Sequence, residues 1–389
     1  MFYWLSIIIG LLSVVGCCQL VLAALLTHRF VRTGAPPSRT SSPGVTILKP
    51  LHGVAPGLAE NITSFCIQNY RGPTQIVFGV QDPNDEAIAI VERLRAGHAA
   101  CHLDLVIDST IHGLNRKVSN LINMWRRVEH DIIIVSDSDI RVSPKYVSRI
   151  VTELEQPGVG AVTCLYHGFA TAGVWSRVAA LGINAHFLPS VVVGLGLGLA
   201  QPCFGSTIAI KRRALAEIGG FIGVADCLAD DFALGAALRA RGHKIAVSPV
   251  TIGHVCAEMS ARELWQHEVR WGRTIRSIDP VGYVGSVLTH AFPLALLAAL
   301  TGFLAQSPTL MVGAGLAIAA LGCRLVLLRQ VERTFGLRPQ SYWLIGLRDL
   351  LSFAVFVSSL FGRNARWKGR RYSFRSGGTL VVAGSSSTP

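Results

Sequence analysis

Two aspartates that directly follow an apolar stretch are the residues of this chain with the clearest chemical potential. Residues 132–135 are four β-branched residues in a row, which is typical of a strand buried on both faces. Asp137 and Asp139 come next, one residue apart, so both carboxylates can face one ligand at the strand's carboxyl end. Such a pair suits Mg²⁺ or Mn²⁺ bridging to a diphosphate. Alternatively, Asp137 starts a turn and Asp139 caps the helix near Pro144, because a lone Asp-x-Asp is common.

Other polar residues stand where predicted strands end or helices begin. Asp82 follows the strand of residues 76–80 and could accept hydrogen bonds from a base or a ribose, although a turn carboxylate fits equally well. Lys117 could neutralise a phosphate, or it could be an exposed surface lysine. Asp230 and Asp231 open a helix, where the macrodipole alone favours acids. Alternatively, one of them is a general base, because their apolar neighbours would keep it partly dry.

Residues 265–276 form an amphipathic helical pattern that carries two further candidates. Arg270 could contact a diphosphate, and Trp271 could stack on a sugar or a lipid. Alternatively, both side chains anchor an interfacial helix.

The elements that must position these residues alternate between strand and helix. This pattern predicts an α/β domain with a parallel sheet and right-handed crossovers. Strands are expected at 45–48, 76–80, 103–107 and 132–135, and helices at 58–69, 85–95 and 117–128. No G-x-G-x-x-G follows the first strand, so a nucleotide would have to be held through carboxylates and a metal.

Composition places the chain at a membrane. Half of its 389 residues are apolar, only 15% are charged, and the mean hydropathy is +0.45. The net charge of +13 fits either nucleic acid or an anionic membrane face. The sequence has no zinc finger, RNP motif or lysine-rich arm, and its arginines flank apolar runs, so we expect a membrane and no nucleic acid. Nine cysteines without a CxxC pair fit reduced thiols in a cytoplasmic compartment.

The N-terminal segment predicts the orientation. Residues 1–26 carry no charge and can cross a bilayer, and they lack the basic start of a signal peptide. Arg29, Arg32 and Arg39 follow, which by the positive-inside rule places the N-terminus outside. We therefore expect a membrane helix at 1–28, a linker at 29–44 and a cytoplasmic domain at 45–280.

A C-terminal membrane or re-entrant region is predicted at 281–362. Apolar runs at 283–304 and 309–328 read as a hairpin of two spans. The run at 344–361 contains Arg348 and Asp349, and it fits a shallow segment better than a span. A basic cytoplasmic tail follows at 363–389. The glycine-rich run at 191–199 reads as a loop or half-helix near a lipid entrance, or as a buried strand.

Together these residues resemble a known pattern. Their order resembles the D, D-x-D, D, (Q/R)xxRW set of inverting family 2-like glycosyltransferases with the GT-A fold. A closer resemblance, from Val45 to Thr379, is to glycosyltransferase family 21, the ceramide glucosyltransferases, and to its bacterial branch that includes the hopanoid-biosynthesis glycosyltransferase. The residues that carry it are Lys49-Pro50-Leu51-x-Gly53-Val54, Val80-Gln81-Asp82, Asp137-Ser138-x-Ile140-Arg141-Val142, Ala229-x-Asp231 and Arg371-Tyr372-x-x-Arg375-x-Gly377-Gly378-Thr379.

The resemblance implies a fold and a role for each candidate residue. The fold would be a GT-A nucleotide-diphospho-sugar transferase domain, with a parallel or mixed sheet between helices and transmembrane helices at both ends, in a bacterial inner membrane. The implied roles are donor binding for Asp82, Lys117, Asp137, Arg270 and Trp271, cation binding for Asp137 and Asp139, catalytic base for Asp231, and acceptor or other contacts for Asp230, His267 and Gly205. His267 is a departure, because the family has Gln or Arg there.

The implied reaction is inverting transfer of a hexose from a UDP-sugar to the hydroxyl of a membrane lipid, either ceramide or hopanoid. A divalent cation, Mg²⁺ or Mn²⁺, would assist, and Asp231 would be the base of a single displacement. Alternatives are a processive polysaccharide synthase, which needs more membrane spans around a channel, a metal-dependent lipid phosphoryl transferase, and a non-enzymatic anchor or transporter. The sequence does not select the sugar.

Overall fold

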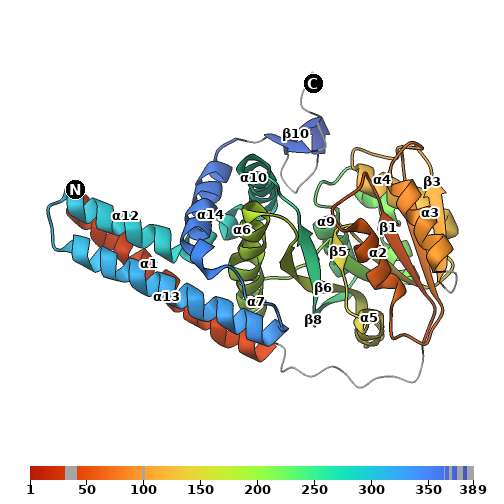
Figure 1. Ribbon diagram of the computed structural model, residues 1–389, viewed down its shortest axis with the longest axis horizontal. Helices are drawn as coiled ribbons and strands as arrows, with labels where there is room; N and C mark the ends of the chain where they lie inside the picture. The colour runs from red at the N-terminus through yellow and green to blue at the C-terminus, as the bar shows by residue number, and fades with distance from the viewer. Residues whose placement is uncertain (31–41, 99–100, 363, 368–369, 375–379, 383–389) are drawn as a thin grey trace.

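The computed structural model describes residues 1–30, 42–98, 101–362, 364–367, 370–374 and 380–382. An α/β domain occupies one end of the elongated molecule, and a bundle of long apolar helices projects from the other (Figure 1). Most of the predicted linker, with Arg32 and Arg39, lies outside the described residues. So do parts of the predicted tail, including Arg375 and Gly377 to Thr379.

An eight-stranded mixed sheet forms the centre of the α/β domain. Its order is β3-β2-β1-β4-β7-β6-β8-β5, and the first four of these strands are parallel. The strand bounds are β1 Val45–Pro50, β2 Thr74–Val80, β3 His102–Ile107, β4 Ile132–Ser136, β5 Ile140–Arg141, β6 Val159–Ala170, β7 Thr207–Lys211 and β8 Lys244–Cys256. The four predicted strands are therefore confirmed. β7 runs antiparallel to both β4 and β6, which makes the sheet mixed.

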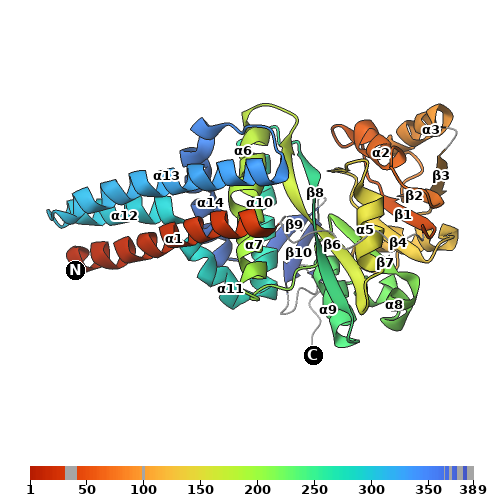
Figure 2. The same ribbon diagram turned by 90° about the horizontal axis from the view of Figure 1, so that it is seen from below.

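Strand β4 is buried on both faces, as its composition predicts. Ile132 and Ile134 belong to one core cluster, and Ile133 and Val135 belong to another. Helices cover the sheet on its two sides (Figure 2). They are α2 Leu58–Cys66, α3 Ala87–Gly97, α4 Arg116–Met124, α5 Tyr146–Leu154, α8 Arg212–Glu217 and α9 Asp230–Ala240.

Three predicted helices differ from the structure at their ends. α2 stops at Cys66 instead of residue 69, and α4 stops at Met124, where a short 3₁₀ turn takes over. α3 begins two residues later than predicted because the Asp85 carboxylate accepts the backbone N–H groups of Ala87 and Gly53. Asn115, which sequence reasoning missed, caps α4 by accepting the Val118 N–H at 3.2 Å.

The projecting bundle consists of α1 Phe2–Phe30, α12 Ala291–Leu304 and α13 Thr309–Phe335 (Figures 1 and 2). The hydroxyls of Ser6 and Ser13 on α1 donate to backbone carbonyls of α12, each at 2.9 Å. A Cβ at Gly16 would lie 2.6 Å from the Leu288 carbonyl oxygen. Small residues and interhelical hydrogen bonds of this kind are typical of helices that pack within a membrane.

Four helical segments of the described chain are long and apolar enough to cross a membrane, namely Phe2–Phe30, Val174–Gly196, Thr309–Phe335 and Tyr342–Leu360. A fifth arises if Pro280–Thr289 and Ala291–Leu304, bent by 69°, count as one span, so the predicted run at 283–304 is not straight. The segment from 174 to 196 comprises α6 Val174–Gly182, a π-helical turn and α7 Leu188–Gly196. The half-helix reading of 191–199 therefore holds to Gly196, and the buried-strand alternative is wrong.

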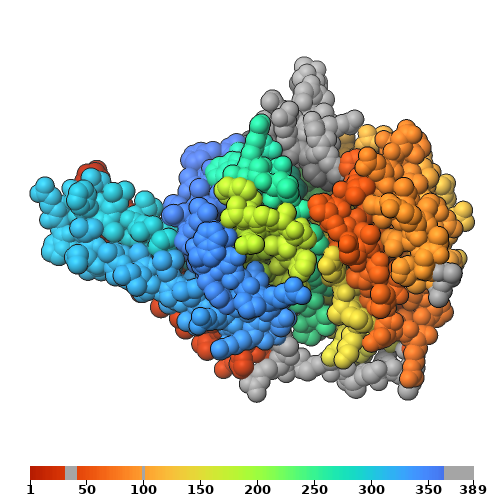
Figure 3. Space-filling view, viewed as in Figure 1, coloured from red at the N-terminus to blue at the C-terminus, as the bar shows by residue number. Residues whose placement is uncertain are grey.

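Two helices connect the bundle to the sheet. α14 Ile345–Leu360 crosses the end of the bundle and lies beside α10 Ala261–Ile278 (Figure 1). In the space-filling view α6, α10 and α14 form a continuous surface between the bundle and the α/β domain (Figure 3). Within the predicted tail, β9 Asn364–Trp367, β10 Arg370–Phe374 and β11 Leu380–Val382 pair as an antiparallel sheet.

Candidate functional site

The chain turns sharply after β4, and this turn presents Asp137 and Asp139. The Asp137 N–H donates to the Ser206 carbonyl at 3.3 Å, and the Asp137 carbonyl accepts from Lys49 Nζ at 2.8 Å. Asp139 does not cap a helix, because the N-cap of α5 is Lys145. The helix-cap alternative is therefore wrong, and both carboxylates lie at the carboxyl end of the strand.

Lys49 supports this turn through its hydrogen bond to the Asp137 carbonyl. The sequence alone gave Lys49 no role. Its side chain is fully buried in β1, with its ammonium 3.7 Å from the centre of the Phe65 ring. Burial lowers the pKa of Lys49 to about 7, although the carboxylates of Asp137 and Asp139 act in the opposite direction. A lysine inside an otherwise apolar strand was the available signal.

The donor atoms at the turn fit a hard divalent cation. Asp139 Oδ1 is buried and has no hydrogen-bond partner among the described residues, and Asp139 Oδ2 lies 3.8 Å from His254 Nδ1. Buried carboxylate oxygens are normally satisfied, so this oxygen is suited to receive a ligand. Oxygen donors of this kind are those that Mg²⁺ and Mn²⁺ prefer. Asp137 and Asp139 are therefore the residues that would hold the ion.

Lys117 lies inside the site, so its interpretation as an exposed surface lysine is wrong. Its Nζ is 2.7 Å from Asp137 Oδ1 and 3.7 Å from Asp230 Oδ2, and it donates to the Gly205 carbonyl at 3.3 Å. Burial alone would lower the pKa of Lys117, but the two carboxylates raise it well above its ordinary value. Lys117 therefore stays charged and links the turn after β4 to the start of α9.

Asp231 is held on two backbone N–H groups at the start of α9. Its Oδ2 accepts from Gly205 at 2.7 Å, and its Oδ1 accepts from Phe232 at 2.8 Å. Burial raises the pKa of Asp231 to about 6, and the neighbouring Asp230 carboxylate adds to the effect. The carboxylate is thus ionised at neutral pH yet more basic than an ordinary aspartate, which suits a general base.

Asp230 is committed to other partners. Its Oδ1 accepts from Asn115 Nδ2 at 3.3 Å, and its Oδ2 faces Lys117. Burial raises the pKa of Asp230, and the Lys117 ammonium opposes this. Of the two adjacent acids, Asp230 is the one that pairs with Lys117, whereas Asp231 makes no ion pair among the described residues.

Asp82 lies farther along the same edge of the sheet. It follows β2, which is separated from β4 only by β1, and all three strands are parallel. The Asp82 side chain is exposed, and its Oδ1 accepts the Asn84 N–H at 2.9 Å. The turn contact that the sequence allowed is therefore present, while the exposed carboxylate remains open to a ligand.

Helix α10 forms a wall of the site through Trp271. The Trp271 ring lies 6.0 Å from the His254 ring, and His254 also faces Asp139. In the described part of the chain, the guanidinium of Arg270 makes no hydrogen bond or ion pair. Burial lowers the pKa of Arg270 to about 10. A desolvated arginine without a counter-ion is suited to an anionic ligand.

The His267 side chain is paired with a neighbouring acid. Its Nδ1 lies 2.9 Å from Glu258 Oε1, and its ring packs edge-on against Trp271 with 4.5 Å between centroids. Glu258 Oε2 is buried without a partner among the described residues. At the position where the resemblance implied Gln or Arg, this chain therefore has a histidine that is paired to a glutamate.

Tyr166 is another residue of the site that sequence reasoning missed. It stacks on Phe187, with ring centroids 4.6 Å apart. Burial raises the pKa of Tyr166, and the carboxylates of Asp231, Asp139 and Asp137 raise it further. Its ring also lies 5.6 Å from the ring of His254, which faces Asp139. No sequence signal marked it, because strand β6 was not predicted.

A second group of possible metal ligands lies away from this site. His102, Asp104 and Glu129 are within reach of one ion. His102 begins β3, so the group is at the amino edge of the parallel strands, opposite Asp82 and Asp137. Asp104 also accepts from the buried Gln75 at 2.7 Å. This cluster does not belong to the site at the carboxyl edge.

Comparison with known proteins identifies the family of the chain. The sequence profile of glycosyl transferase family 21 matches residues 8–380. Ceramide glucosyltransferase 3 of Caenorhabditis elegans is 26% identical over 361 residues, covering 88% of this chain and 75% of that protein. Ceramide glucosyltransferase 1 of the same organism is 25% identical over 230 residues, covering 59% of this chain and only 49% of that protein.

A solved structure has the same fold. A mannosyltransferase from Pyrobaculum calidifontis, solved in complex with GDP-Man and Mn²⁺, aligns over 93% of this chain and 99% of its own, with a TM-score of 0.54 and 19% identity. The expected GT-A fold, with a mixed sheet between helices and apolar helices at both ends, is thereby confirmed. Because the family profile spans nearly the whole sequence, the chain belongs to glycosyl transferase family 21.

Proposed function

We propose that the protein transfers a hexose from a UDP-sugar to the hydroxyl of a membrane lipid, ceramide or hopanoid, with inversion. The observation that carries the proposal is the placement of Asp231. Its carboxylate is oriented by two N–H donors and connected through Gly205 and Lys117 to Asp137 of the cation-binding pair. A base and an electrophile-activating site thus adjoin each other in a domain joined to apolar helices.

Two charged side chains of the donor half, Asp82 and Arg270, make no ion pair with the residues that the structure describes. Asp82, open at the sheet edge, would accept hydrogen bonds from the uridine part. Arg270 would take up negative charge from the departing diphosphate, because its own charge is desolvated and uncompensated. When bound at Asp137 and Asp139, a divalent cation would act as a Lewis acid on the diphosphate oxygens.

The acceptor half depends on Asp231. Each of its carboxylate oxygens accepts one backbone N–H, which fixes the orientation and leaves a further lone pair for the acceptor's proton. The pKa of about 6 makes the carboxylate a useful base at neutral pH. One base without a second carboxylate acting as nucleophile implies a single displacement, so an α-linked donor would give a β-linked product.

A lipid acceptor is supported by the apolar elements around the site. α7 packs against α1 of the bundle, and beyond its end Leu197 and Leu199 are exposed. The relatives named ceramide glucosyltransferase point to an acceptor of the same class.

We place the α/β domain on the cytoplasmic side of a bacterial cell membrane. Basic residues occupy the last turns of α1 and α13, namely His28 and Arg29 on the first and Arg333 on the second. Both ends lie on the domain side of the bundle (Figure 1). Basic flanks mark the cytoplasmic ends of membrane helices.

The proposal is tested with membranes that contain the protein and radiolabelled UDP-glucose, UDP-N-acetylglucosamine or UDP-galactose. We expect a label that partitions into organic solvent as a glycolipid, that needs a divalent cation, and that is lost in Asp231→Asn. Asp131→Asn, an exposed acid at the opposite sheet edge, is the matched control and should transfer normally. An insoluble polymer or a phosphorylated lipid as the labelled product would contradict the proposal.

A further inference from the structure

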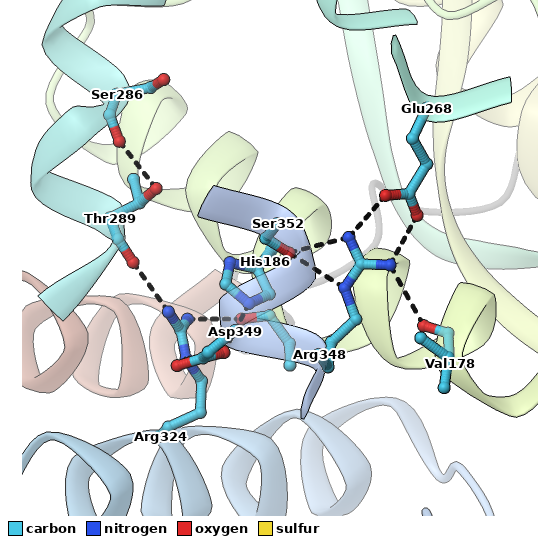
Figure 4. A network of polar contacts seen from close by, with 10 residues as sticks. Val178, His186, Glu268, Ser286, Thr289, Arg324, Arg348, Asp349 and Ser352 are labelled. Atoms are coloured by element: carbon cyan, nitrogen blue, oxygen red, sulfur yellow. Dashed lines mark hydrogen bonds and ion pairs between the residues drawn. The ribbon is translucent and has the colours of Figure 1, made fainter. Parts of the chain in front are cut away.

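A buried ion pair joins α14 to α10, the helix that carries Arg270 and Trp271. Arg348 of α14 donates from Nη1 and Nη2 to the two carboxylate oxygens of Glu268, at 2.5 and 2.8 Å (Figure 4). It also donates to Ser352 Oγ, at 2.9 Å from Nε and 2.7 Å from Nη2, and to the Val178 carbonyl, at 3.3 Å from Nη1. Only 4% of Arg348 is exposed. The guanidinium is thus held in one orientation by a fork on a carboxylate.

The next residue of α14 fixes this helix to the bundle. Asp349 pairs with Arg324 of α13 at 3.3 Å and with His186 Nε2 at 2.7 Å (Figure 4). Arg324 in turn donates to the carbonyls of Ala185 and Thr289, at 2.8 and 2.7 Å. Two adjacent residues of α14 therefore bind different neighbours. Asp349 binds the bundle, and Arg348 binds α10.

Helix α10 has two different faces. On one side Gly272 approaches α14 so closely that a Cβ there would lie 2.6 Å from Ser359 Oγ. Glu268 is four residues before Gly272 and so belongs to the same face. On a neighbouring face, His267 and Trp271, also four residues apart, contact each other, and Trp271 contacts His254. Because a helix moves as a rigid rod over one turn, a shift at Glu268 also shifts Trp271 and Arg270.

Energetics alone do not explain this ion pair. A buried pair often contributes less to stability than apolar residues of the same volume would, because both charges must be desolvated. The two parallel hydrogen bonds between Arg348 and Glu268 instead fix the geometry of the contact, namely the distance and the register between the two helices.

We propose that Arg348 and Glu268 are positioning residues that hold α10 in register, so that Arg270 and Trp271 meet the donor diphosphate and the lipid head. Through Asp349 and Arg324, this register is set by the membrane bundle. The inference rests on the proposed function only for the identity of the ligands that α10 contacts. A misplacement of about 1 Å at a catalytic centre can cost roughly a hundredfold in rate.

The first test is a double-mutant cycle with Arg348→Lys, which keeps the charge and loses the fork, and Arg270→Ala. We expect Arg348→Lys to lower kcat/KM for transfer by roughly ten- to a hundredfold. In the Arg270→Ala background the same substitution should cost clearly less than in wild type, because one of the two residues that it positions is already gone. Full additivity in the cycle would overturn the proposal. Arg262→Lys, an exposed arginine on α10, is the control and should change neither rate nor cycle.

A second variant separates positioning from folding. The pair Glu268→Met with Arg348→Met removes both charges and leaves no unpaired ion, so we expect its unfolding temperature to stay near that of wild type. Its transfer rate should nevertheless fall at least about tenfold. Wild-type transfer by a folded Met pair would show that the ion pair is only structural and would overturn the inference.

UDP affinity, measured by calorimetry with Mn²⁺, tests the inference without any acceptor. We expect both Arg348→Lys and the Met pair to weaken UDP binding, and unchanged affinity in both would overturn the inference. If wild type binds UDP but forms no glycolipid, the proposed acceptor is wrong, while the UDP measurement still decides whether α14 positions α10.

Discussion

The pH dependence of transfer offers a quantitative test of Asp231 as the base. A general base acts only when it is deprotonated, so activity should be full above its pKa and should fall as the pH drops below it. Burial, followed by the charge of Asp230, raises the pKa of Asp231 to about 6. The acid limb of the profile should therefore lie well above the ordinary aspartate value of about 3.9.

The expected size of the effect follows from the pKa. With a value of about 6, the ionised fraction of Asp231 falls from about nine-tenths at pH 7 to about one-tenth at pH 5, a loss of about tenfold. An unperturbed aspartate would still be more than about nine-tenths ionised at pH 5. Asp230→Asn removes the neighbouring negative charge, so it should move the acid limb of the profile toward lower pH.

The assay is kcat/KM for the donor between pH 4.5 and 8, because this ratio reports the free enzyme. The cation concentration is held constant, since a cation beside Asp231 favours the ionised carboxylate. Asp131→Asn serves as the control and should keep the wild-type profile. A flat profile down to pH 5 in wild type, or an acid limb that Asp230→Asn leaves in place, would refute the assignment. So would near-normal turnover by Asp231→Asn.

Three other changes test separate parts of the site. Asp139→Asn changes the carboxylate that has the orphan oxygen, so it should weaken Mn²⁺ binding by more than the roughly 10–100-fold typical of an outer-shell partner. Mn²⁺ binding is measured by titration in the presence of UDP. Gly205→Ala places a Cβ 3.1 Å from Asp231 Oδ2, so kcat should fall while the calorimetric UDP affinity holds; weaker UDP binding with normal kcat would contradict this. Lys49 has a folded pKa of about 7, below its unfolded value, so the free energy of unfolding should rise from pH 7 toward pH 10, by up to about 1.4 kcal/mol per pH unit. Denaturant titrations should show that slope lost in Lys49→Met.

The sequence was sufficient to predict the parallel half of the sheet. Runs of β-branched residues such as 132–135 can hardly be anything other than a buried strand, and the two aspartates after it are displayed by the alternation of an extended chain. β6, β7 and β8 carry Gly, Ser, Thr and His among their apolar residues. Without a clean period of two, these strands could not be recognised.

Residues that act through distant partners could not be assigned from the sequence. Lys117 looks like a surface lysine until β4 and α9 bring Asp137 and Asp230 to it. Arg348 and Asp349 look like interruptions of a membrane span, and only the packed structure supplies Glu268 and Arg324 as their partners. In each case the signal is a tertiary contact between residues far apart in the chain.

The stereochemistry of the product shows whether Asp231 drives a single displacement. Purified protein is incubated with an α-linked UDP-hexose and lipid extract from the host, and the glycolipid is analysed by mass spectrometry and by NMR of its anomeric proton. We expect a single hexose, β-linked to a lipid hydroxyl. An α-linked glycolipid, or a hexose polymer in its place, would contradict a displacement driven by Asp231 alone.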